Sequence, residues 1–374
     1  MIYFDNAATS SPKPMSVINA ARNAMLNYSV NPGRGGYERS IKCSEMIYCV
    51  REKSAKLFNA KSAENIIFTQ NCTTALNIVM QGLINSGDHF IISSLEHNAV
   101  YRTAVALKER GAWFDVANVY DNDEQTAAEF ERLIKPNTKA IVCTHASNIT
   151  GQILPIFKIG EICKRYDLIF IVDAAQTAGI IDIDIQKMNI DYLCIAPHKG
   201  LYAPLGTGIL ISDGKPKPLI FGGTGSNSIS EYQPEFTPDK YESGTLNVTG
   251  IAGIGAGIDF IKRNKSAIER EKRLSERMHN ELSKTDGVSI YSKADENHVP
   301  ICLFNINGLA SEETAQKLAD RGIAVRAGLH CAPLAHGFIG TKDGGAVRAA
   351  FSVFNNESQV DMFVKSVRQI KKSL

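Results

Sequence analysis

Two short apolar runs, residues 168–172 and 192–195, each end abruptly in polar side chains that can do chemistry. Asp173 follows the first run, and Lys199 follows the second. Short, fully apolar runs are typical of central strands in a parallel sheet, which are buried on both faces. Ligands of such sheets bind beyond the carboxyl ends of the strands. We therefore expect this carboxylate and this amine to face one crevice.

An acid and a lysine in one crevice have two interpretations. The simpler one is a salt bridge, and the two residues considered alone favour it. In the other, the lysine forms a Schiff base with a carbonyl compound and the carboxylate keeps a pyridinium nitrogen protonated. These are the two requirements that pyridoxal phosphate (PLP) places on a protein. The other polar residues of the chain decide between them.

Polar residues also follow the other predicted strands. Thr73 and Thr74 come after one strand and open a helix, where free N–H groups and the helix dipole attract a phosphate. Threonine is also a common helix cap, so this signal is weak by itself. His97 follows the next strand, and His145 and Asn148 follow another. A lone histidine is more often structural, but five successive strand ends that carry polar residues favour a pocket.

The elements that would position these residues alternate between strand and helix from Asn65 onward. Strands separated by helices predict βαβ units and a mostly parallel sheet. The expected strands are 66–69, 90–93, 113–117, 140–143, 168–172, 192–195, 208–211 and 219–221. The expected helices are 15–28, a second one that ends near 58, 74–83, 98–110, 126–134 and 156–165.

The pattern changes after Gly250. We expect a long helix over 266–283, strands over 288–291, 302–306 and 325–326, and a final helix. In that helix apolar residues recur at i, i+3, i+4 and i+7, and Asn356 with Gln359 forms a capping box. The predicted organisation is an arm over 1–14 that packs with the small domain, a large domain over 15–255 and a small α+β domain over 256–374.

Two glycine-rich stretches need separate interpretation. The loop 31–37 carries Arg34 and is either a flexible connection or a mobile loop near a mouth or an interface. The stretch Gly253-Ile-Gly-Ala-Gly257 resembles a dinucleotide fingerprint, but no strand precedes it, so close helix packing is the better interpretation.

The composition is that of an ordinary globular protein. The 374 residues are 44% hydrophobic, and 41 basic residues balance 39 acidic ones, which gives no reason to expect nucleic acid or an acidic membrane surface. No apolar run approaches the roughly 20 residues that span a bilayer, and no secretory signal is visible. None of the eight cysteines forms a CxxC pair, so no metal site is expected. We expect a reducing, cytoplasmic setting.

Six ordered motifs resemble the class V aminotransferase group of fold-type I PLP enzymes. They are SLEHNAV, HASNITG, VDAAQTAG, PHKGLYAPLGTG, ESGTLN and RAGLHCAPLAH, and the resemblance extends over nearly the whole chain. Within the group they are most similar to cysteine desulfurases and selenocysteine lyases. The resemblance implies an α/β fold-type I PLP-dependent transferase fold, with a large, mostly parallel-sheet domain that has helices on both faces and a smaller α+β C-terminal domain.

The resemblance also implies which residues bind PLP: Thr73, Thr74, His97, Asp173, Gln176, His198, Lys199 and Thr245. Lys199 would hold the cofactor covalently and transfer protons, Asp173 would pair with the pyridinium nitrogen, and His97 would stack on the ring. Gln176 would contact the ring hydroxyl, and the two threonines with His198 would bind the phosphate. Thr245 would reach the phosphate of a neighbouring subunit, which implies a homodimer with shared active sites.

Three residues are implied to bind the substrate: Asn148, Arg326 and Arg348. Asn148 and Arg348 match positions that hold the α-carboxylate, a task that suits a planar guanidinium. Arg326 and His330 also lie near Cys331 in the sequence motif and could lower the pKa of its thiol.

Cys331 separates sulfur chemistry from ordinary transamination. Its spacing alone suggests an incidental loop cysteine, but the resemblance makes it, with Lys199 and His97, a catalytic residue. The implied reaction is a cysteine desulfurase reaction: L-cysteine becomes L-alanine, and the sulfur stays on Cys331 as a persulfide. The connection from Cys331 to Arg348 is short, which resembles the compact-loop subgroup of desulfurases. In that subgroup this cysteine is less mobile and often needs an acceptor protein.

Three alternatives remain open at this level: a selenocysteine lyase, a class V aminotransferase of small amino acids in which Cys331 is incidental, and a PLP-binding scaffold without turnover. Two departures from the usual pattern bear on the site. Ala196 stands where a hydroxyl residue is usual, which would remove one phosphate contact, and Ala203-Pro204 replaces the usual Gly-Pro.

Overall fold

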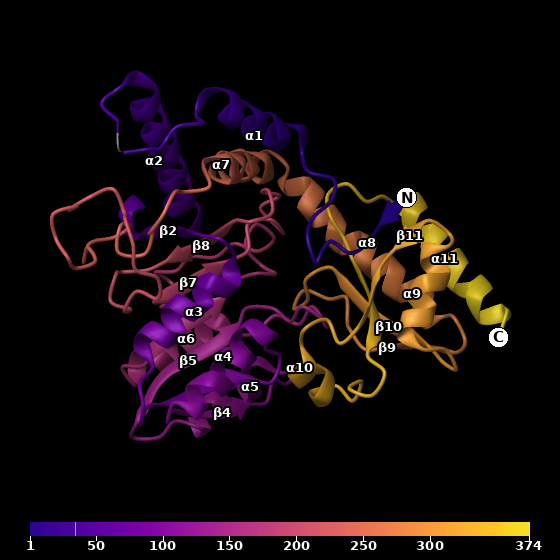
Figure 1. The fold of residues 1–374 in the computed structure, drawn as a ribbon. Coiled ribbons are helices and arrows are strands. Elements are labelled where there is room, and N and C mark those ends of the chain that lie inside the picture. The colour runs from indigo at the N-terminus through magenta and orange to yellow at the C-terminus, as the bar shows by residue number, and fades with distance from the viewer. Residues whose placement is uncertain (34) are drawn as a thin grey trace.

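The structure is a computed structural model that describes residues 1–33 and 35–374. Arg34 lies outside the described residues, so the two interpretations of its loop stay open. Figure 1 shows two sheet-containing parts, one with a seven-stranded sheet and one with a four-stranded sheet. Among the described residues, no helix is both long enough and apolar enough to cross a membrane.

The seven-stranded sheet has the order β2-β8-β7-β6-β5-β3-β4. The pairs from β7 through β4 are parallel, and β8 is antiparallel to both of its neighbours. This confirms the predicted mostly parallel sheet. The strands are β2 (Ile66–Thr69), β3 (His89–Ser93), β4 (Trp113–Ala117), β5 (Thr138–Thr144), β6 (Ile169–Asp173), β7 (Tyr192–Ile195) and β8 (Gly208–Ile211).

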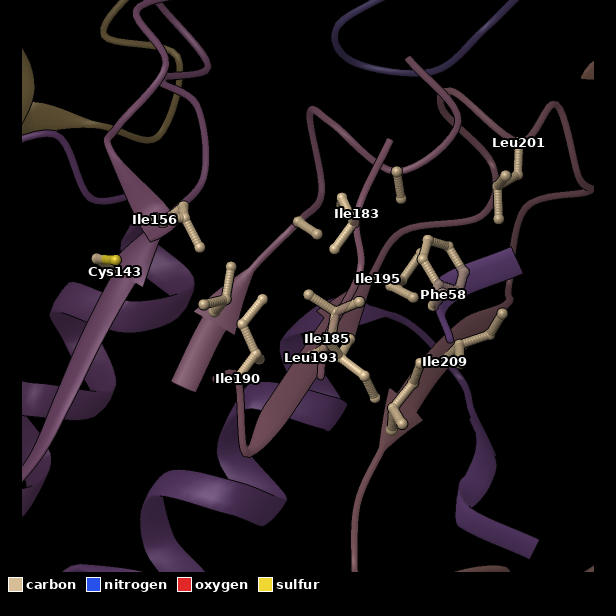
Figure 2. Close-up of a cluster of buried hydrophobic side chains, with 14 of the residues drawn as sticks. Phe58, Cys143, Ile156, Ile183, Ile185, Ile190, Leu193, Ile195, Leu201 and Ile209 are labelled. Atoms are coloured by element: carbon tan, nitrogen blue, oxygen red, sulfur yellow. The ribbon is translucent and has the colours of Figure 1, made fainter. Parts of the chain in front are cut away.

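Successive residues of the central strands alternate between two hydrophobic clusters, one on each face of the sheet. In β7, Leu193 and Ile195 belong to one cluster, and Tyr192 and Cys194 to the other. Figure 2 shows part of the first cluster, where Leu193 and Ile195 lie close to Ile209 of the neighbouring strand. Both faces of these strands are therefore buried, which is why the strands read as uninterrupted apolar runs.

Helices cover both faces of this sheet. The first cluster takes side chains from α2 (Glu38–Phe58), α5 (Asp123–Arg132), α6 (Ile156–Arg165) and α7 (Val248–Arg263), and the second from α3 (Cys72–Leu83) and α4 (Asn98–Glu109). Helix α1 (Met15–Asn27) packs on α7 (Figure 1). The expected domain boundary after residue 255 falls inside α7, which is one continuous helix.

One predicted strand is wrong. Residues 219–221 form no strand, and Phe221 is 72% exposed. Strand β8, which they follow, already pairs with β7 on one side and with β2 on the other. A further strand has no free edge beside β8 to pair with, so an apolar run alone does not make a strand here.

The four-stranded sheet has the order β12-β13-β10-β9 and packs against α8, α9 and α11. The capping box of Asn356 and Gln359 at the start of α11 is present, as predicted. The N-terminal strand β1 (Ile2–Tyr3) pairs in parallel with β11 (Ile323–Ala324) beside this sheet. The remaining elements are α8 (Lys265–Ser283), β9 (Val288–Ile290), β10 (Ile301–Ile306), α9 (Ser311–Ala319), β12 (Arg326–Gly328), α10 (Pro333–Phe338), β13 (Ala346–Ala350) and α11 (Glu357–Lys372).

Candidate active site

A cavity of about 230 Å³ lies at the carboxyl edge of the seven-stranded sheet. Its lining brings together every residue that the family resemblance assigns to the site except Thr74 and Thr245: Thr73, His97, Asn148, Asp173, Gln176, His198, Lys199, Arg326, Cys331 and Arg348. Two larger hollows, of about 440 and 490 Å³, are lined by none of these residues. The chemistry of the lining, and not its volume, therefore identifies the candidate site.

Asp173 ends β6 and is buried at the floor of the cavity. Its Oδ1 atom accepts hydrogen bonds from the Ala175 backbone N–H at 2.8 Å and from the Cys72 thiol at 3.5 Å. These donors hold the carboxylate in one orientation at the end of its strand. Asp173 can therefore present a fixed negative charge to a group in the cavity.

Lys199 follows β7 and shares the cavity with Asp173, but the simple salt bridge between the two is not formed. Lys199 takes part in none of the ion pairs that the described residues make. Burial lowers the pKa of Lys199, and the positive charges of Arg348 and Arg326 act in the same direction against the pull of Asp173. A lowered pKa leaves more of the amine neutral and nucleophilic, as carbonyl chemistry requires.

His97 and His198 line the cavity from two different strand ends. His97 caps α4, and its Nδ1 accepts a hydrogen bond from the Ala99 N–H at 3.0 Å. His198 Nδ1 lies 3.1 Å from the hydroxyl oxygen of Thr9. Burial lowers the pKa of each ring to about 4, so both rings are neutral near pH 7 and act as planar, uncharged walls.

The two threonines at the start of α3 have different positions. Thr73 lines the cavity, whereas the Thr74 hydroxyl donates to Asn71 Oδ1 at 3.1 Å. The same oxygen accepts the Thr74 N–H and caps the helix. Thr74 lines a different hollow from those described so far, together with the exposed residue Thr245. Of the predicted phosphate ligands in α3, the structure thus brings only Thr73 to the cavity.

Arg348 lies on β13 and is 2% exposed. Its Nη1 donates to the Asn148 carbonyl at 2.7 Å, and its Nη2 pairs with Asp5 Oδ1 at 3.0 Å. Among the described residues, the buried atoms Arg348 Nε and Asn148 Oδ1 have no hydrogen-bond partner. A buried donor and a buried acceptor left without partners are costly, and a polar ligand in the cavity can satisfy them.

Cys331 lies in the loop between β12 and α10, and its side chain is exposed at the cavity. The Cys331 carbonyl accepts the N–H of Asn98 at 2.7 Å, and the neighbouring His330 carbonyl accepts from Asn148 Nδ2 at 2.9 Å. Both hydrogen bonds join the loop to the part of the chain that holds the seven-stranded sheet. Residues distant in sequence thereby place a thiol in the same cavity as Lys199.

Several predictions of detail changed in the structure. His145, which the sequence placed at the pocket, is buried and is absent from the lining. Asp5, Cys72 and Ala7 were missed: Asp5 pairs with Arg348, Cys72 donates to Asp173, and the Ala7 carbonyl accepts from Gln176 Nε2 at 3.1 Å. Asp5 and Ala7 belong to the N-terminal stretch DNAATS, a motif-like signal that could have identified them. Ala196 does line the cavity, so the expected loss of a hydroxyl there stands.

Comparison with known proteins gives a consistent family assignment. A family model described as "Aminotransferase class-V" matches residues 2–363. The probable cysteine desulfurase of Methanothermobacter thermautotrophicus is 32% identical, with 99% of this chain and 94% of that protein covered. That of Borreliella burgdorferi is also 32% identical, with 100% and 92% covered.

Solved structures agree. The apo structure of cysteine desulfurase from Thermococcus onnurineus NA1 matches with a TM-score of 0.92 and 31% identity, covering 100% of this chain and 95% of the other. The cysteine desulfurase CsdA (S-sulfonic acid) from Escherichia coli matches with a TM-score of 0.90 and 26% identity, with the same coverage.

Proposed function

The chain belongs to the class V aminotransferase family, and on that premise we propose that it is a PLP-dependent cysteine desulfurase that converts L-cysteine to L-alanine and holds the sulfur on Cys331. One observation carries the proposal: the Cys331 thiol shares a cavity with Lys199, Asp173 and Arg348. An ordinary transaminase has no use for a thiol at that position. The fold and the similarity to cysteine desulfurases point to the same reaction.

The residues of the cavity fit PLP. Lys199 has a lowered pKa and forms no ion pair with another described residue, as the amine that binds the cofactor aldehyde requires. The fixed carboxylate of Asp173 suits the pyridinium nitrogen, and the neutral ring of His97 suits the flat face of the cofactor. When bound, PLP supplies an electron sink that makes bonds at the substrate α-carbon easier to break.

The phosphate would be held beside the start of α3. Thr73 and His198 line that side of the cavity, and the first N–H groups of a helix attract an anion. Gln176 also lines the cavity, and its amide donates to the Ala7 carbonyl, which leaves its side-chain oxygen for the ring hydroxyl. The role of each residue toward the cofactor is part of the proposal.

Arg348 and Asn148 would bind the substrate α-carboxylate, Asn148 through the second N–H of the Nδ2 that already donates to the His330 carbonyl. Arg348 Nε, which has no partner among the described residues, supplies a buried donor, and a guanidinium whose Nη atoms are already fixed is held in one plane. Binding therefore needs little reordering of the side chain. Arg326 lines the cavity on the same side as Cys331 and adds a second positive charge.

The sulfur transfer balances without an external oxidant. L-Cysteine and the Cys331 thiol give L-alanine and a Cys331 persulfide: the Cβ–S bond of the substrate breaks, and an S–S bond forms. The carbon that loses sulfur is reduced and gains a proton, and the transferred sulfur is oxidised. In this proposal Lys199 Nζ would move that proton, and the persulfide would pass its sulfur to an acceptor protein.

We also propose a homodimer. Thr245 is exposed and lines a hollow apart from the cavity of its own chain, a position that suits contact with the phosphate of a partner. Large exposed apolar side chains gather on the neighbouring elements: Met15, Ile18, Met25 and Leu26 of α1, Ile41 and Tyr48 of α2, and Leu219, Ile220 and Phe221 of the following loop region. Burial of these side chains would favour association. A single-chain mass in sedimentation would contradict this proposal.

The reaction is tested with PLP-loaded protein and L-cysteine, with alanine and sulfide both measured in the presence of a reductant. We expect Cys331→Ser to abolish sulfide release, because serine cannot hold the sulfur. Cys49→Ser is the matched control, since Cys49 is also exposed but lies on α2. Mass spectrometry should find one added sulfur on Cys331 after exposure to L-cysteine.

Three outcomes would overturn the proposal. Full sulfide release by Cys331→Ser would remove the thiol from the reaction. Amino transfer to a 2-oxo acid that persists in that variant would identify an aminotransferase. Turnover limited to selenocysteine, with alanine and selenide as products, would identify a selenocysteine lyase.

A further inference from the structure

A chain of hydrogen bonds runs behind the Cys331 loop. Thr341 Oγ1 lies 2.7 Å from His336 Nδ1, and His336 Nε2 lies 3.2 Å from His330 Nδ1. His330 Nε2 in turn lies 3.2 Å from the backbone oxygen of Arg326. The three side chains are buried, and the planes of the two imidazoles are 14° apart with 5.5 Å between ring centres. This group, Thr341–His336–His330, is called the histidine relay below.

The direction of every hydrogen bond in the relay follows from the bond between His330 and the Arg326 carbonyl. The Arg326 carbonyl can only accept, so His330 Nε2 carries a hydrogen. Burial lowers the pKa of His330 to about 3 and also lowers the pKa of His336, so both rings are neutral. His330 Nδ1 must then accept from His336 Nε2–H, and His336 Nδ1 must accept from the Thr341 hydroxyl. Reversal of any one bond would leave two donors or two acceptors facing each other.

The relay is attached to a backbone segment that needs support. His330 and Cys331 both have positive φ values, 50° and 57°. This left-handed conformation costs a residue with a Cβ about 1 kcal/mol, and it persists only where the surroundings hold it. From the cavity side, Asn148 and Asn98 donate to the two carbonyls of this pair. From the other side, the relay holds the His330 ring.

We propose that His336 and Thr341 are positioning residues for Cys331: they hold His330 in one tautomer and one orientation, and thereby keep the left-handed pair that presents the Cys331 thiol to the cavity. The inference rests on the proposed function, in which Cys331 receives the sulfur. Neither residue lines the cavity, so each acts through His330.

Thr341→Val and Thr341→Ser form the first test pair. Valine keeps the shape but removes the donor to His336 Nδ1, whereas serine keeps the donor. For PLP-loaded protein we expect kcat for sulfide release to fall about fivefold to tenfold in Thr341→Val, which corresponds to one lost buried hydrogen bond. KM for L-cysteine should change less than about twofold, because Arg348 is untouched, and Thr341→Ser should behave like the parent.

His336→Phe and His336→Gln form the second pair and protect the test against a variant that fails to fold. Phenylalanine fills the space without a donor, and glutamine can return an N–H to His330 Nδ1. We expect at least a tenfold loss of kcat in His336→Phe and a partial recovery in His336→Gln. A role in stability alone would lower the melting temperature of both without restoring kcat in the glutamine variant.

Two readouts do not depend on turnover. In nitrogen-15 NMR spectra, both rings should show the neutral Nε2–H tautomer at pH 7, and an Nδ1–H pattern for His330 would overturn the proposal. Hydrogen exchange of the loop amides 329–332 should accelerate about tenfold in Thr341→Val while that of α11 stays unchanged.

The outcomes separate this inference from the proposed function. If Cys331→Ser keeps full sulfide release, the proposed function fails. If Cys331→Ser is inactive but Thr341→Val and His336→Phe keep the parent kcat and loop exchange, the relay proposal fails by itself.

Discussion

The guanidinium of Arg348 is buried in the candidate site and held by two partners. Its Nη atoms are taken by a backbone carbonyl and by Asp5, and burial lowers its pKa, although the guanidinium stays charged at any ordinary pH. The fixed plane leaves Nε as the donor without a partner among the described residues. A lysine cannot reproduce this geometry, because its ammonium has no second or third nitrogen.

We therefore expect Arg348→Lys to raise KM for L-cysteine by roughly tenfold to a hundredfold, the equivalent of about 1.5–3 kcal/mol for a lost charge-assisted hydrogen bond. Steady-state kinetics of sulfide release measure this. Arg321→Lys, at an exposed position on the surface, is the matched control. An unchanged KM would show that the α-carboxylate binds elsewhere.

Helix α7 positions the loop that carries Lys199. A Cβ added at Gly257 would lie 1.9 Å from the Leu201 carbonyl oxygen, and one added at Gly253 would lie 2.3 Å from Pro204. The glycines thus let the helix approach the backbone that follows Lys199. The glycine spacing of residues 253–257 therefore serves helix packing and is not a dinucleotide-binding fingerprint. Close packing of this kind is the interpretation that the sequence favoured.

Gly257→Ala should lower the free energy of unfolding by about 1–3 kcal/mol, because the clash with backbone exceeds the roughly 1 kcal/mol that alanine gains in a helix. Urea unfolding measures the change. Gly337→Ala in α10 is the control: its added Cβ meets only Lys342 at 3.9 Å, so no loss of stability is expected. Equal stability of the parent and Gly257→Ala would show that the helix can shift away.

At the scale of the whole molecule, the two sheet-containing parts are joined by a buried tyrosine close to Lys199. The Tyr202 hydroxyl donates to Glu271 Oε1 at 3.2 Å and accepts the Val353 N–H at 3.0 Å. Glu271 lies on α8 and Val353 follows β13. Burial raises the pKa of Glu271 to about 8, so the carboxyl is protonated in the folded protein at neutral pH.

This raised pKa predicts a pH dependence of stability. Between about pH 4.5 and 8 the folded chain keeps a proton on Glu271 that the unfolded chain releases, so the free energy of unfolding falls as the pH rises through this range. Glu271→Gln keeps an acceptor for Tyr202 and carries no titrating proton. Thermal unfolding at pH 5 to 9 measures this dependence. We expect the free energy of unfolding to fall less steeply with rising pH in Glu271→Gln than in the parent, and Glu296→Gln, at an exposed position, is the control. The same pH dependence of stability in the parent and in Glu271→Gln would exclude Glu271 as its source.

The sequence by itself determined where the seven strands of the large sheet lie, and it gave the observed ends of β2, β4, β7 and β8. Apolar runs such as 192–195 are bounded at the residues where β7 begins and ends, because a strand buried on both faces has to be apolar along its whole length. The polar residues after those runs, Asp173 and Lys199 among them, were correctly placed at one edge. Local patterning also identified the capping box of α11.

Only the tertiary structure decided which of these residues meet. The hydroxyl of Thr74 turns to Asn71, His145 is buried and absent from the cavity lining, and Asp5 pairs with Arg348 from the opposite end of the chain. The position of the Cys331 thiol and the histidine relay behind it depend on hydrogen bonds between parts of the chain far apart in sequence. Such contacts leave no periodic pattern in the sequence. They depend on how the two sheet-containing parts pack together and not on the local conformational preferences of the residues.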